Sequence, residues 1–193
     1  MRARLIGILL AATAVLAGAD SAAWAADELK IGSSRGTIEF AIGDSRLFRT
    51  TGSFKNWQGK VEVDDTDIPR SSVEVTIQTA SIQMMDKQQT EMLKDADFFD
   101  VQKYPQLTFR STRIERTSDT TLKVDGQITL RGITRPMILD VKVSDRRRDA
   151  PPGARYAHFD GKGRIKRSEF GMTKFLDMVG DEVEFSINTD AWR

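Results

Sequence analysis

Few side chains in this sequence have the chemistry of a catalytic or metal site. The 193 residues include a single histidine, His158, and no cysteine. Thiol catalysis and thiolate metal binding are therefore excluded, and neither a histidine metal cluster nor a Ser-His-Asp constellation is visible. His158 lies in the alternating segment Ala157-His158-Phe159-Asp160, so we expect Phe159 to point inward and His158 to be a solvated strand residue.

Carboxylates are plentiful, but their surroundings do not suggest chemistry. Asp97 and Asp100 flank Phe98-Phe99, with no base or nucleophile nearby in the sequence, so we expect them to cap turns. The segment Asp64-Asp65-Thr66-Asp67 lacks the glycine and terminal glutamate of a calcium loop. We therefore predict no catalytic residue, no metal site and no cofactor.

The beginning of the chain has the pattern of a secretory signal. Arg2 and Arg4 precede an apolar run from Leu5 to Ala19, and Ala23-Trp24-Ala25 matches an A-x-A cleavage site. The run is shorter than the roughly 20 residues that a membrane-spanning helix needs. We predict a signal peptide over residues 1–25, cleaved after Ala25, and a periplasmic or secreted domain over residues 26–193.

The predicted mature chain has no excess charge. The whole chain has 29 Lys+Arg and 28 Asp+Glu; removing Arg2, Arg4 and Asp20 leaves 27 of each. A neutral chain has no basic surplus to neutralise phosphates, which argues against nucleic acid as a partner.

Apolar residues alternate with polar ones in several segments spread along the mature chain. This period of two is typical of strands with one buried face and one wet face, and it favours an antiparallel sheet. Closure into a barrel would hide the sheet edges, so we predict an all-β, extended antiparallel barrel; a two-sheet sandwich is the alternative. The clearest alternating segments are 38–43, 73–78, 107–110, 122–130, 139–143 and 183–188.

One stretch breaks the alternation. The sequence DKQQTEMLKDADFFD, from Asp86 to Asp100, contains helix formers and no β-branched residue except Thr90. Asp86 followed by Gln89 is an N-cap pattern. We predict a short helical insertion over about residues 87–94 that covers one end of the barrel.

The inward-facing residues would either fill the barrel or line a cavity for a ligand. Methionine and phenylalanine in the segments without strand period favour a cavity, because apolar loops need something to cover and methionine suits adaptable ligand surfaces. We therefore predict an apolar ligand-binding lumen. Its predicted residues are Ile38, Phe40, Ile42, Phe48, Phe54, Val75, Ile77, Phe98, Phe99, Phe109, Ile128, Leu130, Phe159, Met172, Phe175 and Phe185.

Four stretches of the mature chain resemble the YceI-like family of exported lipid-binding proteins. They read TIEFAIGDSRLFRTTGSFKNWQGKVEVD, EMLKDADFFDVQKYPQLTFRSTRI, VDGQITLRGITRPMILDV and GRIKRSEFGMTKF. The resemblance runs from about Leu29 to Asp190. It implies a lipocalin-like barrel with a helical insertion, a long internal pocket and no catalytic centre. Where relatives often have a His-Leu-Gly-like segment, this chain has Gly43-Asp44-Ser45.

The resemblance also implies a class of ligand. Family members bind isoprenoid chains, fatty acyl amides or similar amphiphiles, and some capture hydrophobic drugs. We therefore expect a carrier or scavenger of a long-chain isoprenoid or acyl lipid, such as a polyisoprenoid or an isoprenoid quinone. Transient membrane contact is expected, and relatives beside membrane cytochromes suggest a cytochrome partner. A filled-core barrel that binds other proteins and a lipid-modifying enzyme are the alternatives, and the oligomeric state is left open.

Overall fold

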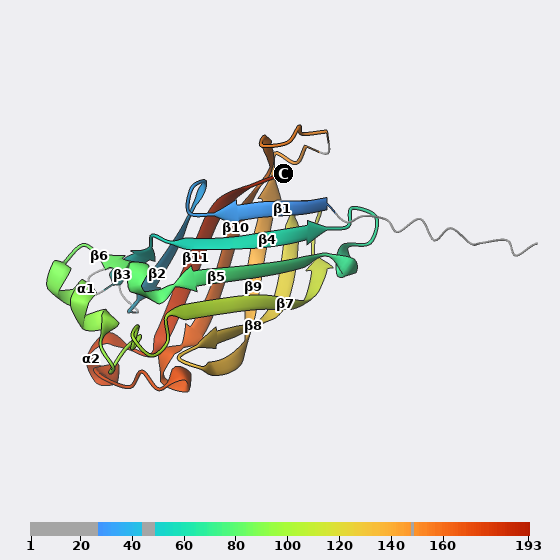
Figure 1. Cartoon of the computed structure of the whole chain (residues 1–193). Coiled ribbons are helices and arrows are strands. Elements are labelled where there is room, and N and C mark those ends of the chain that lie inside the picture. Colours follow the sequence, from blue (N-terminus) through green and yellow to red (C-terminus); the bar gives the residue numbers. More distant parts are fainter. Residues whose placement is uncertain (1–26, 44–48, 148) are drawn as a thin grey trace, which may run out of the picture.

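Antiparallel strands make up most of the part of the chain that the structure describes (Figure 1). The computed structural model describes residues 27–43, 49–147 and 149–193, so the predicted signal peptide and Phe48 lie outside the described residues. The strands are β1 (Asp27–Gly32), β2 (Gly36–Ile42), β3 (Thr50–Phe54), β4 (Trp57–Val63), β5 (Ser72–Gln78), β6 (Ile82–Met84), β7 (Gln106–Arg116), β8 (Thr121–Leu130), β9 (Ile133–Ser144), β10 (Arg155–Lys166) and β11 (Glu182–Trp192). The helices are α1 (Lys87–Lys94) and α2 (Leu176–Val179), with 3-10 turns at Ile68–Arg70, Thr79–Ser81 and Arg167–Phe170.

Eight of these strands close into a barrel. Their order is β1-β4-β5-β7-β8-β9-β10-β11, and β1 pairs with β11 to complete the ring, with Lys30 opposite Trp192. All the pairings are antiparallel. The predicted all-β barrel is confirmed, and the two-sheet sandwich is wrong, because the β1–β11 pairing joins the two edges that a sandwich would leave open.

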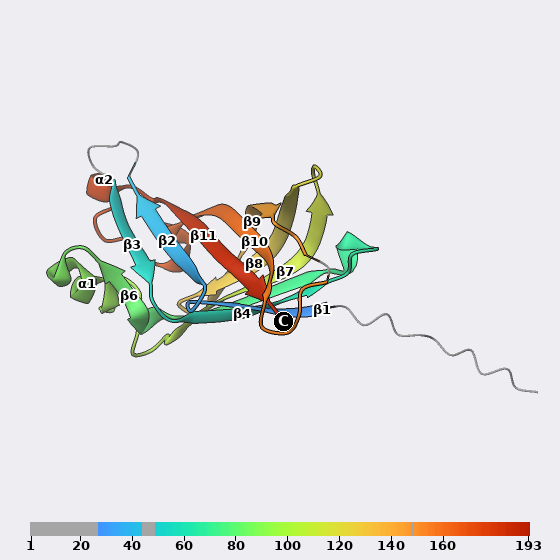
Figure 2. The same cartoon turned by 90° about the horizontal axis from the view of Figure 1, so that it is seen from above.

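The remaining three strands extend the barrel at one end. β1 and β2 pair with successive parts of β11. In the same way, β4 pairs with β1 and β3 with β2, and β5 pairs with β4 and β6 with β3. The pairs β1/β2, β3/β4 and β5/β6 are thus three long strands, each with a kink, at residues 33–35, 55–56 and 79–81. Figure 2 shows β3 and β6 with α1 and α2 at this end. We call it the helical end.

A helical insertion lies between β6 and β7. Helix α1 spans the predicted residues, and the Asp86 side chain accepts a hydrogen bond from the Gln89 N–H at 2.7 Å, so the predicted N-cap is confirmed. The corner that follows is held by the β8–β9 hairpin, where Arg131 donates to the carbonyls of Ala96 and Phe98. The insertion is therefore fastened across the helical end.

Alternate residues of the strands point into the barrel. On β8, Val124, Gly126, Ile128 and Leu130 are buried. A Cβ atom at Gly126 would lie 2.4 Å from the Phe109 ring, so glycine leaves the space that this ring occupies. The interior is thus built from inward side chains and from glycines that make room for them.

Candidate ligand-binding site

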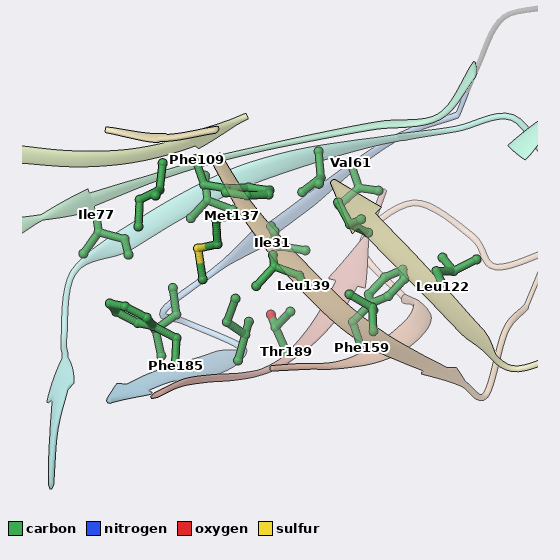
Figure 3. Close-up of a pocket in the computed structure, with 18 of the residues that line it drawn as sticks. Ile31, Val61, Ile77, Phe109, Leu122, Met137, Leu139, Phe159, Phe185 and Thr189 are labelled. Atoms are coloured by element: carbon green, nitrogen blue, oxygen red, sulfur yellow. The ribbon is translucent and has the colours of Figure 1, made fainter. Parts of the chain in front are cut away.

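The middle of the barrel encloses an apolar cavity (Figure 3). Its volume is ≈ 110 Å³, and Thr189 is the one polar side chain among the described residues that line it. The Thr189 hydroxyl is already engaged by the carbonyl of Asp190, at 3.1 Å. The lining residues are Ile31, Ile38, Val61, Val73, Val75, Ile77, Leu107, Phe109, Ile114, Leu122, Val124, Ile128, Met137, Leu139, Val141, Phe159, Gly161, Phe185, Ile187 and Thr189.

A second cavity, of ≈ 150 Å³, lies at the helical end. Phe185 lines both cavities, so they share a wall. Phe175 lies at the edge, 42% exposed, with a left-handed backbone (φ 60°) that residues other than glycine rarely adopt. The lining residues are Phe40, Ile42, Thr50, Met84, Gln89, Met92, Leu93, Phe98, Phe99, Leu130, Ile165, Arg167, Met172, Lys174, Phe175, Val179, Val183 and Phe185.

A third cavity, of ≈ 250 Å³, adjoins the first. It shares Val61, Ile114, Leu122 and Phe159 with the first cavity and no residue with the second. The first cavity therefore shares a wall with each of the others. A 150 Å³ apolar cavity can hold benzene, so by volume the three cavities together have room for a chain of about twenty carbons. The lining of the third cavity also includes the charged residues Arg116, Asp119, Asp145 and Arg146.

The predicted lumen residues fall into four groups. The first cavity is lined by Ile38, Val75, Ile77, Phe109, Ile128, Phe159 and Phe185. The second is lined by Phe40, Ile42, Phe98, Phe99, Leu130, Met172, Phe175 and again Phe185. Phe54 lines neither; its ring packs 5.6 Å from Phe40 and 5.7 Å from Phe99, so it fills the core. Phe48 lies outside the described residues.

Several residues that line the first cavity were not predicted from the sequence. Ile114 follows a β-bulge between Ser111 and Arg113 that shifts the inward phase of β7, so alternation from Leu107 does not reach it. Gly161 has no side chain for a hydrophobic pattern to detect. Leu139 and Ile187 do alternate with polar residues, and extending the inward phase along β9 and β11 would have found them.

Arg167 is the most deeply buried charged residue at the second cavity, at 5% exposed. Its Nε donates to the carbonyl of Gly180 at 2.8 Å, and its Nη1 donates to those of Met172 and Lys174 at 3.1 and 2.6 Å. Burial lowers the pKa of Arg167, and Asp181 acts in the opposite direction. These bonds hold the segment between β10 and β11 against the cavity.

Asp181, which does not line the cavity, stabilises the same segment through hydrogen bonds from Ser168. Burial alone would raise the pKa of its carboxyl, but hydrogen bonds from the N–H and hydroxyl of Ser168, both 2.8 Å, and the nearby charges of Arg167 and Lys166 hold that pKa below its ordinary value. The carboxylate therefore stabilises the fold at neutral pH, and this contribution is lost as the pH falls through the lowered pKa.

Removing this charge gives a pH-dependent prediction. Asp181→Asn should lower the free energy of unfolding by about 1 kcal/mol at pH 7, because a charged acceptor of two hydrogen bonds is lost at a partly exposed site. The difference from the parent protein should shrink as the pH falls below about 4, the unfolded pKa of an aspartate, and through the lowered pKa of the folded state. Urea unfolding at several pH values measures both; a difference that does not change with pH would contradict the prediction.

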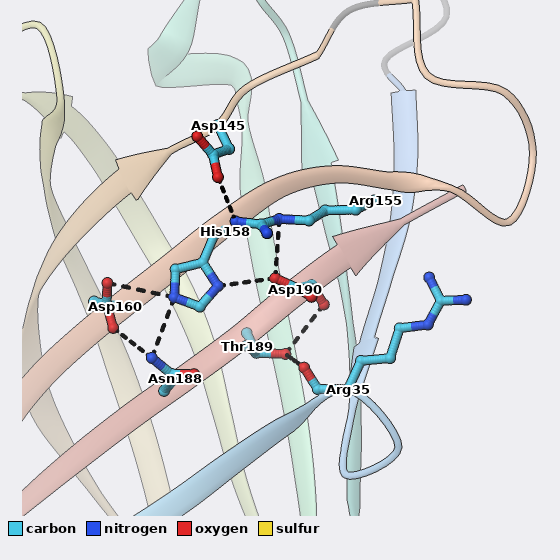
Figure 4. Close-up of polar contacts among 8 residues, drawn as sticks. All are labelled: Arg35, Asp145, Arg155, His158, Asp160, Asn188, Thr189 and Asp190. Carbon is cyan, nitrogen blue, oxygen red and sulfur yellow. Dashed lines mark hydrogen bonds and ion pairs between the residues drawn. The ribbon is translucent and has the colours of Figure 1, made fainter.

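The single histidine lies on the outer face of β10 (Figure 4). Its Nδ1 is 2.8 Å from Asp190, and its Nε2 is 3.1 Å from the Asn188 amide and 3.5 Å from Asp160. Arg155 joins the cluster through Asp190 at 3.1 Å and Asp145 at 2.9 Å. An aspartate–histidine pair can activate a nucleophile, but here the other ring nitrogen meets an amide and a carboxylate. The arrangement is a surface polar cluster, as expected for an outward His158.

The described part of the chain has neither a metal-binding group of side chains nor a helix suited to cross a membrane. Its residues contain no group of three or more His, Cys, Asp or Glu arranged to hold a metal ion. Within the same residues, neither helix has the length and apolar character needed to cross a bilayer.

Comparison with known proteins identifies the family. The model of the YceI-like domain matches residues 29–191. The chain is also 31% identical over 192 residues to protein YceI of Salmonella newport, covering 98% of this chain and 97% of the relative. The chain belongs to the YceI-like family. The recognition made from the four sequence stretches is therefore confirmed.

Solved structures share this YceI-like fold. BcnA of Burkholderia cenocepacia superposes with a TM-score of 0.72 and 27% identity, covering 83% of this chain and 98% of that one. A polyisoprenoid binding domain from Saccharophagus degradans superposes with a TM-score of 0.60 over 86% of this chain and 98% of that one. At 11% identity the second likeness concerns the fold alone.

Proposed function

We propose that this YceI-like protein is a periplasmic or secreted binding protein that holds a long apolar amphiphile inside its barrel. The observation that carries the proposal is the apolar cavity in the middle of a closed barrel. A further cavity lies at each end of it, and each of these shares lining residues with the middle cavity. The ligand class is an isoprenoid or acyl chain, such as a polyisoprenoid, an isoprenoid quinone or a fatty acyl amide. The polyisoprenoid-binding relative with the same fold supports this class.

The energetics of the cavities favour such a ligand. Transfer of about twenty methylenes from water to an apolar interior is worth about 16 kcal/mol, at about 0.8 kcal/mol each. Ordering the chain and losing its free motion cost a large part of this, which leaves an affinity between about micromolar and nanomolar. The binding step is therefore desolvation of the chain, and headgroup contacts add selectivity.

The two alternative functions lack a comparable observation. A filled-core barrel would leave no cavity with an almost wholly apolar lining in its middle. A lipid-modifying enzyme would need a nucleophile or base beside the bound chain, whereas His158 lies on the outer face of the barrel. We propose a carrier or scavenger without catalysis.

Exposed apolar side chains suggest how the ligand enters. Met85 is 101% exposed and Met178 is 81% exposed; each is near a residue that lines the second cavity, Met84 and Phe175 respectively. Exposed apolar residues beside a binding cavity favour an interaction with a lipid surface. We propose transient membrane contact at the helical end, with displacement of Phe175 as the gate. A membrane cytochrome partner stays a prediction.

Native mass spectrometry of protein purified from the periplasm tests the proposal. We expect a co-purified lipid, or uptake of an added isoprenoid or acyl lipid by the emptied protein, and a mature chain that begins at Ala26. A protein that is empty as isolated and takes up neither lipid would overturn the binding function. Recovery of the protein in the cytoplasm with residues 1–25 still attached would overturn the proposed location.

A further inference from the structure

The two cavities that share Phe185 differ in charge. Among the described residues, none that lines the first cavity is charged, whereas the second is lined by Arg167 and Lys174 and by no acidic side chain. The one polar side chain of the first cavity, Thr189, is already hydrogen-bonded. A ligand that spans both cavities would therefore have its apolar tail in the barrel and positive charge around its other end.

Arg167 retains unused hydrogen-bonding capacity. Its Nη2 is buried and has no hydrogen-bond partner among the described residues, while Nε and Nη1 donate to three backbone carbonyls. No carboxylate in the described chain forms an ion pair with it; the nearby Asp181 accepts both of its hydrogen bonds from Ser168. A buried cation without a direct counter-charge is costly, and a bound anion would offset that cost.

The second cation, Lys174, lies at the exposed edge of the same cavity. Its side chain is 45% exposed, and its Nζ pairs with Asp97 of the corner that follows α1. Because this pair is near the surface, its energy is small, and the lysine can turn toward a ligand at little cost. One cation is thus fixed and buried, and the other is adjustable.

We propose that Arg167 and Lys174 form a binding site for an anionic headgroup, so that the ligand is a long-chain carboxylate or phosphate lipid with its head at the helical end. This rests on the proposed function, because it assigns the polar end of the chain held in the barrel. The Nη2 group of Arg167 donates to an oxygen of the head, and Lys174 closes over it. The three carbonyls that fix Arg167 make the donor rigid before the ligand arrives.

A set of lipids with one chain and different heads tests the assignment. Dissociation constants are measured for oleate, oleyl phosphate and neutral oleamide by native mass spectrometry with a fluorescence competition assay. We expect at least one of the two anions to bind at least tenfold more tightly than oleamide, and the preferred anion identifies the headgroup as carboxylate or phosphate. Equal affinities for all three would overturn the headgroup site and leave the binding function standing. No binding of any lipid would overturn the binding function itself.

Variants distinguish two roles of Arg167: binding a headgroup, and holding the backbone through its hydrogen bonds to carbonyls. Arg167→Gln and Lys174→Gln should each reduce the preference for the anion by at least fivefold, while oleamide still binds as in the parent protein. Lys162→Gln, on the outer face of β10, removes the same charge away from the cavity and should keep the full preference. Arg167→Lys keeps the charge and should retain part of the preference for the anion. A full preference for the anion in folded Arg167→Gln protein would overturn the proposal, and if that variant does not fold, a full preference in Lys174→Gln would do so.

Discussion

Replacing Gly161 with leucine is expected to weaken binding of a long-chain lipid about a thousandfold while the barrel stays folded. Gly161 lies on β10 between Val141 and Ile187 and lines the first cavity. A Cβ atom there would meet its neighbours at 3.6 to 3.8 Å, which is ordinary van der Waals contact. The remaining carbons of leucine would occupy the ≈ 110 Å³ through which the chain must pass.

The expected loss follows from the methylenes that no longer fit. Excluding five methylenes from the first cavity costs about 4 kcal/mol at about 0.8 kcal/mol each, which corresponds to a dissociation constant about a thousandfold higher. Titration of oleate, followed by native mass spectrometry, measures the loss, and urea unfolding reports whether stability is kept.

Lys162→Leu is the matched control for Gly161→Leu. It introduces the same side chain at the next residue of β10, on the exposed outer face. This variant should bind oleate as the parent protein does. If Gly161→Leu also keeps its affinity, the lipid does not pass through the middle of the barrel.

The second large effect is expected from a charge placed in the second cavity. Phe40 is 7% exposed, lines that cavity and packs on Phe54. Phe40→Asp loses the packing of a buried aromatic ring, about 3 to 5 kcal/mol, and adds the burial of an unpaired carboxylate. The total approaches the whole stability of an ordinary domain, about 5 to 15 kcal/mol. We expect a protein that is largely unfolded, or folded without its lipid, at neutral pH.

The pH dependence of this variant identifies the cause. Burial raises the pKa of the new carboxyl in the folded state above its unfolded value of about 3.9. The variant is therefore least destabilised below about pH 4 and loses stability as the pH rises through the folded-state pKa. Thr51→Asp, which places the same residue on the exposed face of β3, should change the free energy of unfolding by less than about 0.5 kcal/mol. Equal effects of the two variants would show that Phe40 does not face the interior.

Local patterns were enough to predict most of the barrel wall. Alternation places Ile38, Ile128 and Phe185 inward because side chains on a strand change face at every residue. The N-cap at Asp86 was predictable for a similar reason: it depends on the backbone N–H three residues away. Such predictions need no knowledge of what lies across the barrel.

The same reasoning failed where a contact depends on distant segments. Local patterns alone would favour a turn at Asn56-Trp57-Gln58-Gly59, yet Trp57 begins β4, because its ring is buried and its neighbours pair with β1 and β5. Phe54 points inward as alternation predicts, but rings from β2 and the corner after α1 enclose it. Whether an inward residue fills the core or lines a cavity depends on the opposite wall.

The sequence by itself determined the class of this protein: strands with one apolar face, a capped helix, no thiol, one histidine and the motifs of the YceI-like family. Tertiary structure alone decided where the empty space lies and that Arg167, one of several basic residues in GRIKRSEF, is buried beside it. The physical reason is that strand patterns arise between near neighbours in the chain. The volume inside a barrel is instead set by its closure, here by the pairing of β1 with β11 across almost the whole described chain.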